Sequence, residues 1–204
     1  MNLFERLYCY REKAGKHERE NYLTELLAGV LEHDHALCCY LCEKADLQVL
    51  PGTRFRIRTQ VSYSEGQPDI VIDSHASGLF LLIECKLEAG EGDKQLQRYY
   101  AIAEASKAKN RAVIFLTKYY EPARKIPATY LRWHELHKVV AQNQTSVLNT
   151  LFCQYLSHNR LHLSMSFTTA DLLTLEQISA TTAKMDEVLD SIEWKFRGRW
   201  SNWV

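Results

Sequence analysis

Two neighbouring stretches decide the fold: Gln67-Pro68-Asp69-Ile70-Val71-Ile72-Asp73 and, after a short loop, Leu79-Phe80-Leu81-Leu82-Ile83-Glu84-Cys85-Lys86-Leu87. Both are short apolar runs rich in Ile, Val and Leu, which predicts buried strands over 69–73 and 79–87. The five residues between them, 74–78, resemble a hairpin loop, so the two strands are expected to lie side by side.

The flanking segments extend this pair into a sheet. Residues 54–63 alternate between charged and apolar side chains, which predicts a half-buried strand. Residues 91–109 have helical periodicity and lead into 111–118, whose apolar centre predicts a strand buried on both faces. A strand, a helix and a strand in this order form a parallel crossover unit.

The rest of the chain is predicted to be mostly helical, over 18–32, 35–45, 128–157 and 170–198. The sequence therefore predicts an α/β fold, with a mixed central β-sheet flanked by helices and a helical C-terminal extension. We expect a single domain over 1–204, with its core at about 17–120 and the extension at about 128–204.

The composition is that of a globular protein. Of the 204 residues, 46% are hydrophobic and 25% are charged, with 25 basic and 25 acidic side chains. This balance excludes a disordered chain. The longest apolar run, 78–83, is far shorter than the roughly 20 residues that span a bilayer. Met1–Arg6 is charged at once, without an apolar signal region, so we expect a cytoplasmic protein with no membrane partner.

Three charged residues stand at the ends of the paired strands. Glu84 and Lys86 are two residues apart, so their side chains lie on the same face of the sheet. Asp69 follows a proline at the start of the adjoining strand, which can place its carboxylate beside Glu84. Two nearby carboxylates favour a hard divalent cation between them, and a lysine beside it can hold or deprotonate a water. A salt bridge between strand ends is the alternative.

The pattern Pro68-Asp69 followed by Glu84-Cys85-Lys86 resembles the PD-(D/E)XK nuclease superfamily. The resemblance implies a restriction-endonuclease-like core and metal-dependent hydrolysis of phosphodiester bonds in nucleic acid, with DNA as the expected substrate. It also implies Mg²⁺ as cofactor, with Mn²⁺ as a substitute, held by Asp69 and Glu84, and Lys86 as the residue that positions or activates water. The alternative is a catalytically silent module that binds nucleic acid or a protein partner.

Members of this superfamily often carry a further acidic residue on the helix before the sheet. Here the helix contains both Glu20 and Glu25. At 100° per residue, Glu20 lies about 60° from the centre of the apolar face and Glu25 lies nearly opposite it. Helical geometry therefore favours Glu20 as the additional catalytic residue and metal ligand, while Glu25 stays open as the alternative.

The helix after Lys86 carries Gln95-Leu96-Gln97-Arg98-Tyr99, which looks like the Gln-xxx-Tyr motif of the helicase-associated branch. Gln95 and Tyr99 are four residues apart and therefore lie one above the other on a helix face. The resemblance implies that the Gln95 amide and the Tyr99 hydroxyl approach the metal site or a substrate phosphate, with Gln95 as a catalytic residue and Tyr99 as a nucleic-acid contact. Ordinary helix packing is the alternative for both.

Basic and aromatic residues suggest two further surfaces. Arg54, Arg56 and Arg58 form a one-sided stripe that could contact phosphates or could protect a sheet edge. Trp194, Phe196, Trp200 and Trp203 could cap the core or form the interface of a homodimer or of a complex with a protein partner.

A group of cysteines follows the first helix. Cys38 and Cys42 would share a helix face, with His35 one turn earlier, which raises the possibility of a zinc site. The spacing matches no standard zinc motif, and no second ligand pair follows. Packed helix thiols are the expected arrangement.

Overall fold

The computed structural model describes residues 16–87, 94–120, 126–143, 146–164, 174, 177–178 and 181–189. The chain divides into two compact units, Met1–Leu163 and Ser164–Val204. The first unit contains a sheet and the helices that pack on it.

The sheet has five strands, and their spatial order is the same as their order in the chain. The first three strands pair antiparallel, whereas the third, fourth and fifth pair parallel. The strands are β1 (Arg56–Thr59), β2 (Ile70–Ser74), β3 (Leu79–Lys86), β4 (Asn110–Thr117) and β5 (Thr129–Arg132). The predicted hairpin and the predicted parallel crossover are both present.

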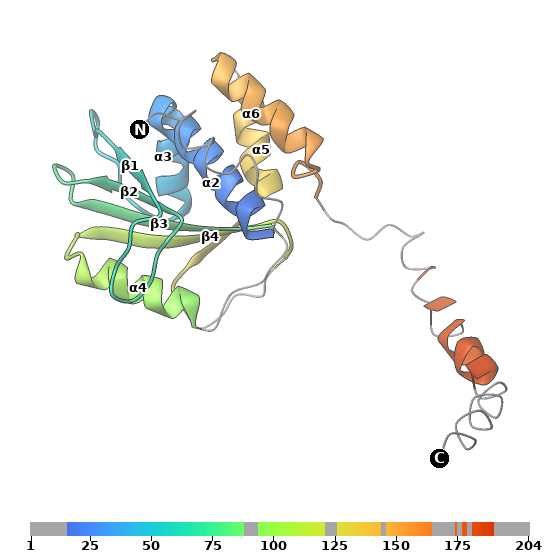
Figure 1. Ribbon diagram of the computed structural model, residues 1–204. Helices are drawn as coiled ribbons and strands as arrows, with labels where there is room; N and C mark the ends of the chain where they lie inside the picture. Colours follow the sequence, from blue (N-terminus) through green and yellow to red (C-terminus); the bar gives the residue numbers. More distant parts are fainter. Residues whose placement is uncertain are drawn as a thin grey trace. The chain divides into compact units, whose positions relative to one another are not determined.

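Helices cover both faces of the sheet (Figure 1). One helix, α4 (Gln95–Ala105), lies on one face between β3 and β4. The opposite face carries α2 (Lys16–His33), α3 (His35–Lys44), α5 (Trp133–Gln142) and α6 (Val147–His158). This arrangement confirms the predicted α/β fold with a mixed sheet flanked by helices.

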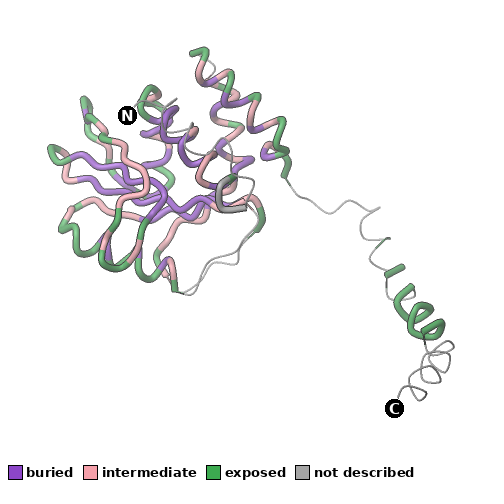
Figure 2. Tube along the Cα trace, in the orientation of Figure 1, coloured by how far each residue is buried: buried purple, intermediate pink, exposed green. Residues whose placement is uncertain are grey.

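The two apolar faces of β2 and β3 build two separate hydrophobic clusters. Ile72, Leu81 and Ile83 pack against the four-helix side, whereas Val71 and Leu82 pack against α4. Figure 2 shows that the buried segments concentrate in these central strands. Because both faces are covered, β2 and β3 are continuous apolar runs instead of alternating ones.

The structure corrects two of the elements predicted from the sequence. Residues 129–132, predicted to be helical, form strand β5, which pairs parallel with β4 at the edge of the sheet. The first strand is shorter than 54–63, because Gln60 adopts a left-handed φ of 51° directly after it. Val61 consequently packs with the α4 cluster, whereas Phe55 and Ile57 pack on the opposite face.

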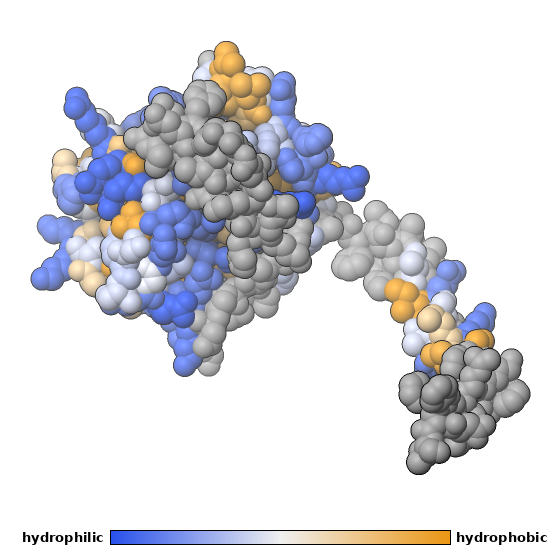
Figure 3. Space-filling model, viewed as in Figure 1, coloured by the Kyte–Doolittle hydropathy of each residue, from blue (hydrophilic) through white to orange (hydrophobic). Residues whose placement is uncertain are grey.

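Two of the exposed large hydrophobic residues of the first unit, Val147 and Leu151, lie at the start of α6. Figure 3 shows hydrophobic residues gathered over this end of α6. In the second unit, 181–189 form a helix with exposed side chains. The aromatic residues Trp194, Phe196, Trp200 and Trp203 lie outside the described residues. No helix in the described part of the chain is long and apolar enough to cross a membrane.

Candidate active site

Glu84 and Lys86 lie at the C-terminal end of β3, the central strand of the sheet. Strand alternation puts both side chains on the face that α4 covers, in line with Leu82. Glu84 is 2% exposed. A charged side chain at such a position is costly unless other groups hold it, so its contacts determine what the site can do.

Asp69 lies next to Glu84 because of the pairing of β2 with β3. Ile70 pairs with Ile83, so Asp69 is the next residue along the ladder. The Oδ2 atom of Asp69 accepts a hydrogen bond from the backbone N–H of Cys85 at 2.8 Å, and Oδ1 accepts one from Nε2 of Gln60 at 3.0 Å. The carboxylate thus binds the backbone of β3 where the β2 strand begins, and it is held beside Glu84.

The two oxygens of Glu84 differ in their surroundings. Oε1 lies 2.8 Å from Nζ of Lys86 and accepts a hydrogen bond from Nε2 of Gln95 at 2.6 Å. Oε2 is buried and has no hydrogen-bond partner among the described residues. A buried carboxylate oxygen without a partner is destabilising, and it marks a position that a cation or a water can satisfy.

Burial and mutual repulsion control the ionisation of this cluster. Burial, followed by the neighbouring Glu84 carboxylate, raises the pKa of Asp69 to about 7. Burial also raises the pKa of Glu84, although Lys86 opposes this shift. Burial opposes the charge on Lys86, yet the carboxylates of Glu84 and Glu20 outweigh it and raise the pKa of this lysine. Lys86 is therefore protonated at neutral pH.

Gln95 and Tyr99 on α4 continue the network from Glu84. Nε2 of Gln95 also donates a hydrogen bond to the hydroxyl of Tyr99 at 3.0 Å. The Tyr99 hydroxyl in turn donates one to the backbone carbonyl of Gln67 at 2.9 Å. The structure thus places both residues of the predicted motif at the site, where they connect Glu84 to the segment that precedes Asp69.

Glu20 reaches the same site from α2. Its Oε1 accepts a hydrogen bond from the backbone N–H of Leu87 at 3.1 Å, and its Oε2 lies 3.5 Å from Nζ of Lys86. Glu25, which helical geometry puts nearly opposite the centre of the apolar face, is also buried, with 3% of its surface exposed. α6 packs against α2, with the rings of Tyr22 and Tyr155 6.0 Å apart, so α2 is buried on more than one side.

The donor set suits a cation with few protein ligands. In the described ranges, no three histidine, cysteine or carboxylate side chains converge as a complete metal cage. Asp69 and Glu84 supply two buried carboxylates, and one oxygen of Glu84 has no hydrogen-bond partner among the described residues. This set fits Mg²⁺, which is usually held by one or two carboxylates together with waters and substrate phosphates.

The comparison with known protein families agrees with this geometry. A family model described as the PD-(D/E)XK nuclease superfamily matches residues 8–166 of the chain. The chain belongs to the PD-(D/E)XK nuclease superfamily. No curated protein and no solved structure matches the chain. The superfamily match extends beyond the expected core at 17–120, and it includes β5, α5 and α6.

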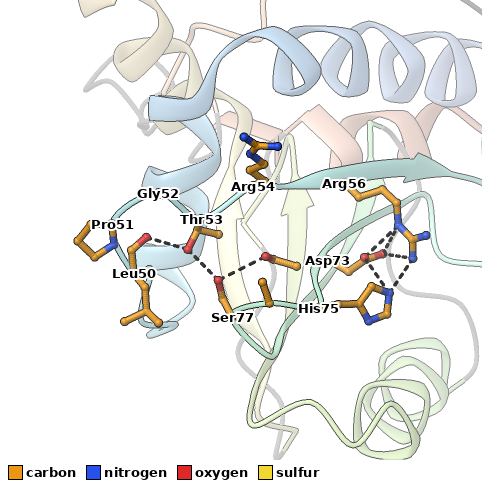
Figure 4. Close-up of a pocket in the computed structure, with 11 residues that line it drawn as sticks. Leu50, Pro51, Gly52, Thr53, Arg54, Arg56, Asp73, His75 and Ser77 are labelled. Atoms are coloured by element: carbon orange, nitrogen blue, oxygen red, sulfur yellow. Dashed lines mark hydrogen bonds and ion pairs between the residues drawn. The ribbon is translucent and has the colours of Figure 1, made fainter.

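The three arginines of this PD-(D/E)XK protein lie away from the Asp69 and Glu84 carboxylates. Arg56 and Arg58 both pair with Asp73, at 3.0 Å and 2.6 Å. Asp73 is near the end of β2 opposite to Asp69, roughly 13 Å along the strand. Arg54 precedes β1 and is exposed. Figure 4 shows Arg54 pointing away from the Asp73–His75 group, at a cavity of about 550 Å³.

The cysteines on α3 are packed as core thiols. Cys38 donates a hydrogen bond from Sγ to the backbone carbonyl of Leu31 at 3.2 Å, and Cys42 is fully buried. Burial raises the pKa of both thiols far above the ordinary range. Zinc binds the thiolate form, so this environment does not favour a zinc site at Cys38 and Cys42.

Two supporting residues could not be found from the sequence. The indole Nε1 of Trp133 donates a hydrogen bond to the backbone carbonyl of Lys86 at 3.1 Å. Gln60 holds Asp69 from the segment after β1. Both contacts depend on how distant elements pack, and neither residue belongs to a local pattern that would have indicated it.

Proposed function

We propose that the protein is a metal-dependent nuclease that hydrolyses phosphodiester bonds in nucleic acid, with DNA as its substrate. One observation carries the proposal: two buried carboxylates, Asp69 and Glu84, lie side by side where β2 and β3 pair, and Nζ of Lys86 lies 2.8 Å from Glu84. Repulsion between the carboxylates disfavours the doubly ionised pair unless a divalent cation joins them.

Asp69 and Glu84 would hold Mg²⁺, or Mn²⁺ in its place. When bound, such an ion lowers the pKa of a water and offsets charge on the phosphoryl oxygens. Glu84 offers Oε2, which has no partner among the described residues, while Oε1 is engaged by Lys86 and Gln95. Asp69 is held in place by its bonds to Cys85 and Gln60.

Lys86 acts as a protonated, positively charged ammonium group in this scheme. Its raised pKa argues against proton abstraction from water in the metal-free arrangement. We therefore assign it to orienting the attacking water and to offsetting the charge that develops on the phosphate. Glu20 positions this ammonium from the other side at 3.5 Å, and its role as a further direct metal ligand stays a prediction.

Gln95 and Tyr99 are proposed to orient the site. Gln95 fixes the rotamer of Glu84 through its hydrogen bond to Oε1. Tyr99 accepts a bond from Gln95 and donates one to Gln67, so it links α4 to the segment before β2. A contact of Tyr99 with a substrate phosphate would require this hydroxyl to exchange its bond to the Gln67 carbonyl.

Arg54, Arg56 and Arg58 are proposed to contact the nucleic-acid backbone outside the site. Two arginines on one aspartate leave a net positive charge, which suits phosphate oxygens. Their separation from Asp69 places such contacts away from the phosphate that is cleaved. Arg54 and Arg56 are both exposed, and Arg54 is the one for which the described residues provide no ion pair.

Purified protein incubated with plasmid, linear duplex and single-stranded DNA, in Mg²⁺, Mn²⁺ or EDTA, tests the proposal. A parallel incubation with RNA tests the choice of DNA. We expect cleavage in Mg²⁺ and Mn²⁺, none in EDTA, and none by Glu84→Gln in any condition. Binding of DNA without cleavage by the wild-type protein in both metals would replace the nuclease with the silent binding module.

A further inference from the structure

A second cavity, of about 480 Å³, lies beside the carboxylate site and is not used by the scheme above. Its size is within the range of pockets that bind small ligands. It is lined by residues from α2, α6 and the ends of β3 and β4, which are Arg19, Leu23, Leu87, Lys118, Tyr155, Asn159 and Leu161.

Three backbone connections attach this cavity to the proposed catalytic groups. Arg19 directly precedes Glu20 on α2. Leu87 directly follows Lys86, and its N–H donates the hydrogen bond to Glu20. The backbone N–H of Lys118 donates a hydrogen bond to the carbonyl of Lys86 at 3.2 Å. The cavity and the Lys86 site therefore share a wall.

Among the described residues that line it, the cavity has two cations and no acidic side chain. Arg19 is exposed and Lys118 is half-buried, and neither forms an ion pair with a carboxylate of the described residues. The Nζ atom of Lys118 lies 5.2 Å from the ring centre of Tyr119. Arg19 and Tyr155 both line the cavity. Two such cations suit a phosphate group.

The remaining lining is largely apolar. Leu23 is a fully buried part of the core, and Leu161 is also buried. The ring of Tyr155 is half-buried, so one part of it packs in the protein and another part faces the cavity. Aromatic and aliphatic surfaces of this kind bind the faces of unpaired bases.

We propose that this cavity binds one unpaired nucleotide of the substrate strand, next to the phosphate that is cleaved. Arg19 and Lys118 bind its phosphate, while Tyr155 and Leu87, the partly exposed apolar lining residues, contact its sugar and base. The inference rests on the proposed nuclease function and specifies the substrate: a single strand, or a duplex with an unpaired or extruded nucleotide at the cleavage position. A base that stays paired and stacked in a duplex cannot enter a cavity of this kind.

Binding without cleavage tests this inference. A fluorescein-labelled single-stranded DNA 12-mer is titrated in EDTA, by fluorescence anisotropy, over a series of salt concentrations. Arg19→Ala and Lys118→Ala are each expected to raise Kd about tenfold and to reduce the slope of log K against log salt by about 0.7, the loss of one single-strand phosphate contact. Arg19→Lys, which keeps the charge, is expected to recover most of the slope.

Lys44→Ala is the matched control. Lys44 is an exposed lysine in the last turn of α3, outside the cavity and outside the proposed site. It is expected to bind like the wild-type protein. Thermal unfolding of every variant, monitored by circular dichroism, shows whether a change in Kd reflects a change in folding.

The outcomes separate the cavity from the catalytic proposal. Binding by folded Arg19→Ala and Lys118→Ala that equals the Lys44→Ala control overturns the cavity, even where cleavage in Mg²⁺ is normal. A tenfold loss with the reduced slope supports the cavity, even where the wild-type protein cleaves nothing. A blunt duplex that competes as well as the single strand overturns the requirement for an unpaired nucleotide.

Discussion

Nζ of Lys86 lies 2.8 Å from Oε1 of Glu84, the residue two positions before it on β3. This contact neutralises one oxygen of a buried carboxylate, while the other oxygen has no partner among the described residues. The lysine therefore stabilises the ionised form of Glu84 in the metal-free protein, and it leaves one oxygen available to a cation.

Replacing Lys86 separates its charge from its shape. Lys86→Ala is expected to lower the single-turnover cleavage rate at least about a hundredfold, the effect typical of a lost catalytic group. Mn²⁺ binding should persist, because the carboxylates remain. Lys86→Arg should recover little activity, since the planar guanidinium does not fit the space of a compact ammonium. Full activity of Lys86→Ala would reduce this residue to a salt-bridge partner and favour the binding module.

The carboxylates are tested with isosteric amides. Asp69→Asn and Glu84→Gln should each abolish metal-dependent cleavage, while the protein stays folded because each amide oxygen can still accept a hydrogen bond. Asp69→Asn in particular preserves an acceptor for the Cys85 N–H. Calorimetric titration with Mn²⁺ should show weak or no binding. Wild-type affinity for Mn²⁺ in both variants would move the metal site elsewhere.

The raised pKa of Asp69 predicts how the metal-free stability depends on pH. The folded protein retains a proton up to about pH 7, whereas the unfolded chain loses it near 3.9. The free energy of unfolding therefore falls as the pH rises through this interval. In EDTA, the wild-type protein should melt at least about 3 °C higher at pH 5.5 than at pH 8, the shift produced by roughly 1 kcal/mol.

Asp69→Asn is the control for this titration. A second set of measurements compares the melting temperature with and without Mg²⁺ at both pH values. The variant should lose most of the pH dependence, because the amide does not ionise. Mg²⁺ should stabilise the wild-type protein more at pH 8 than at pH 5.5, since the cation competes with the proton for the carboxylates. Equal pH dependence in the wild-type protein and Asp69→Asn would contradict the assignment.

Gln95→Ala is expected to reduce the cleavage rate about tenfold or more without changing the fold. Its amide holds Oε1 of Glu84, so its removal frees the carboxylate to adopt other rotamers. Tyr99→Phe should have a smaller effect, since it removes the hydroxyl that accepts from Gln95 and donates to Gln67 but leaves the bond between Gln95 and Glu84 in place. Cleavage rates measured against Mg²⁺ concentration distinguish this role, because a positioning residue shifts the metal dependence. An unchanged Mg²⁺ dependence in Gln95→Ala would indicate simple helix packing.

Two arginines of the stripe, Arg56 and Arg58, pair with Asp73, whereas Arg54 has no ion pair among the described residues. Arg58→Ala should lower the free energy of unfolding by about 1–2 kcal/mol, because it removes hydrogen bonds to the buried Asp73 carboxylate. Arg54→Ala should change stability by less than about 0.5 kcal/mol, as exposed substitutions usually do, and should weaken DNA binding at low salt. Urea unfolding and anisotropy measure the two effects. Unchanged DNA binding by Arg54→Ala would remove Arg54 from the interface.

The hairpin and the Asp69, Glu84 and Lys86 group could be predicted because their signals are local. Apolar runs of strand length and the two-residue repeat are properties of adjacent residues. β5 was missed because four residues are too few to distinguish a strand from a helix by periodicity. The burial of Glu25 was missed for another reason: α6, more than a hundred residues away in the chain, covers a second side of α2.

The hydrogen bond from Trp133 to the Lys86 carbonyl has a consequence for deletion experiments. Trp133 is fully buried at the start of α5, directly after β5. A fragment that stops at residue 120 contains every residue of the motif, yet it lacks this tryptophan and leaves β4 as an unpaired, aggregation-prone edge. The minimal folding unit therefore extends well past the motif, through the helices that hold the end of β3 in place.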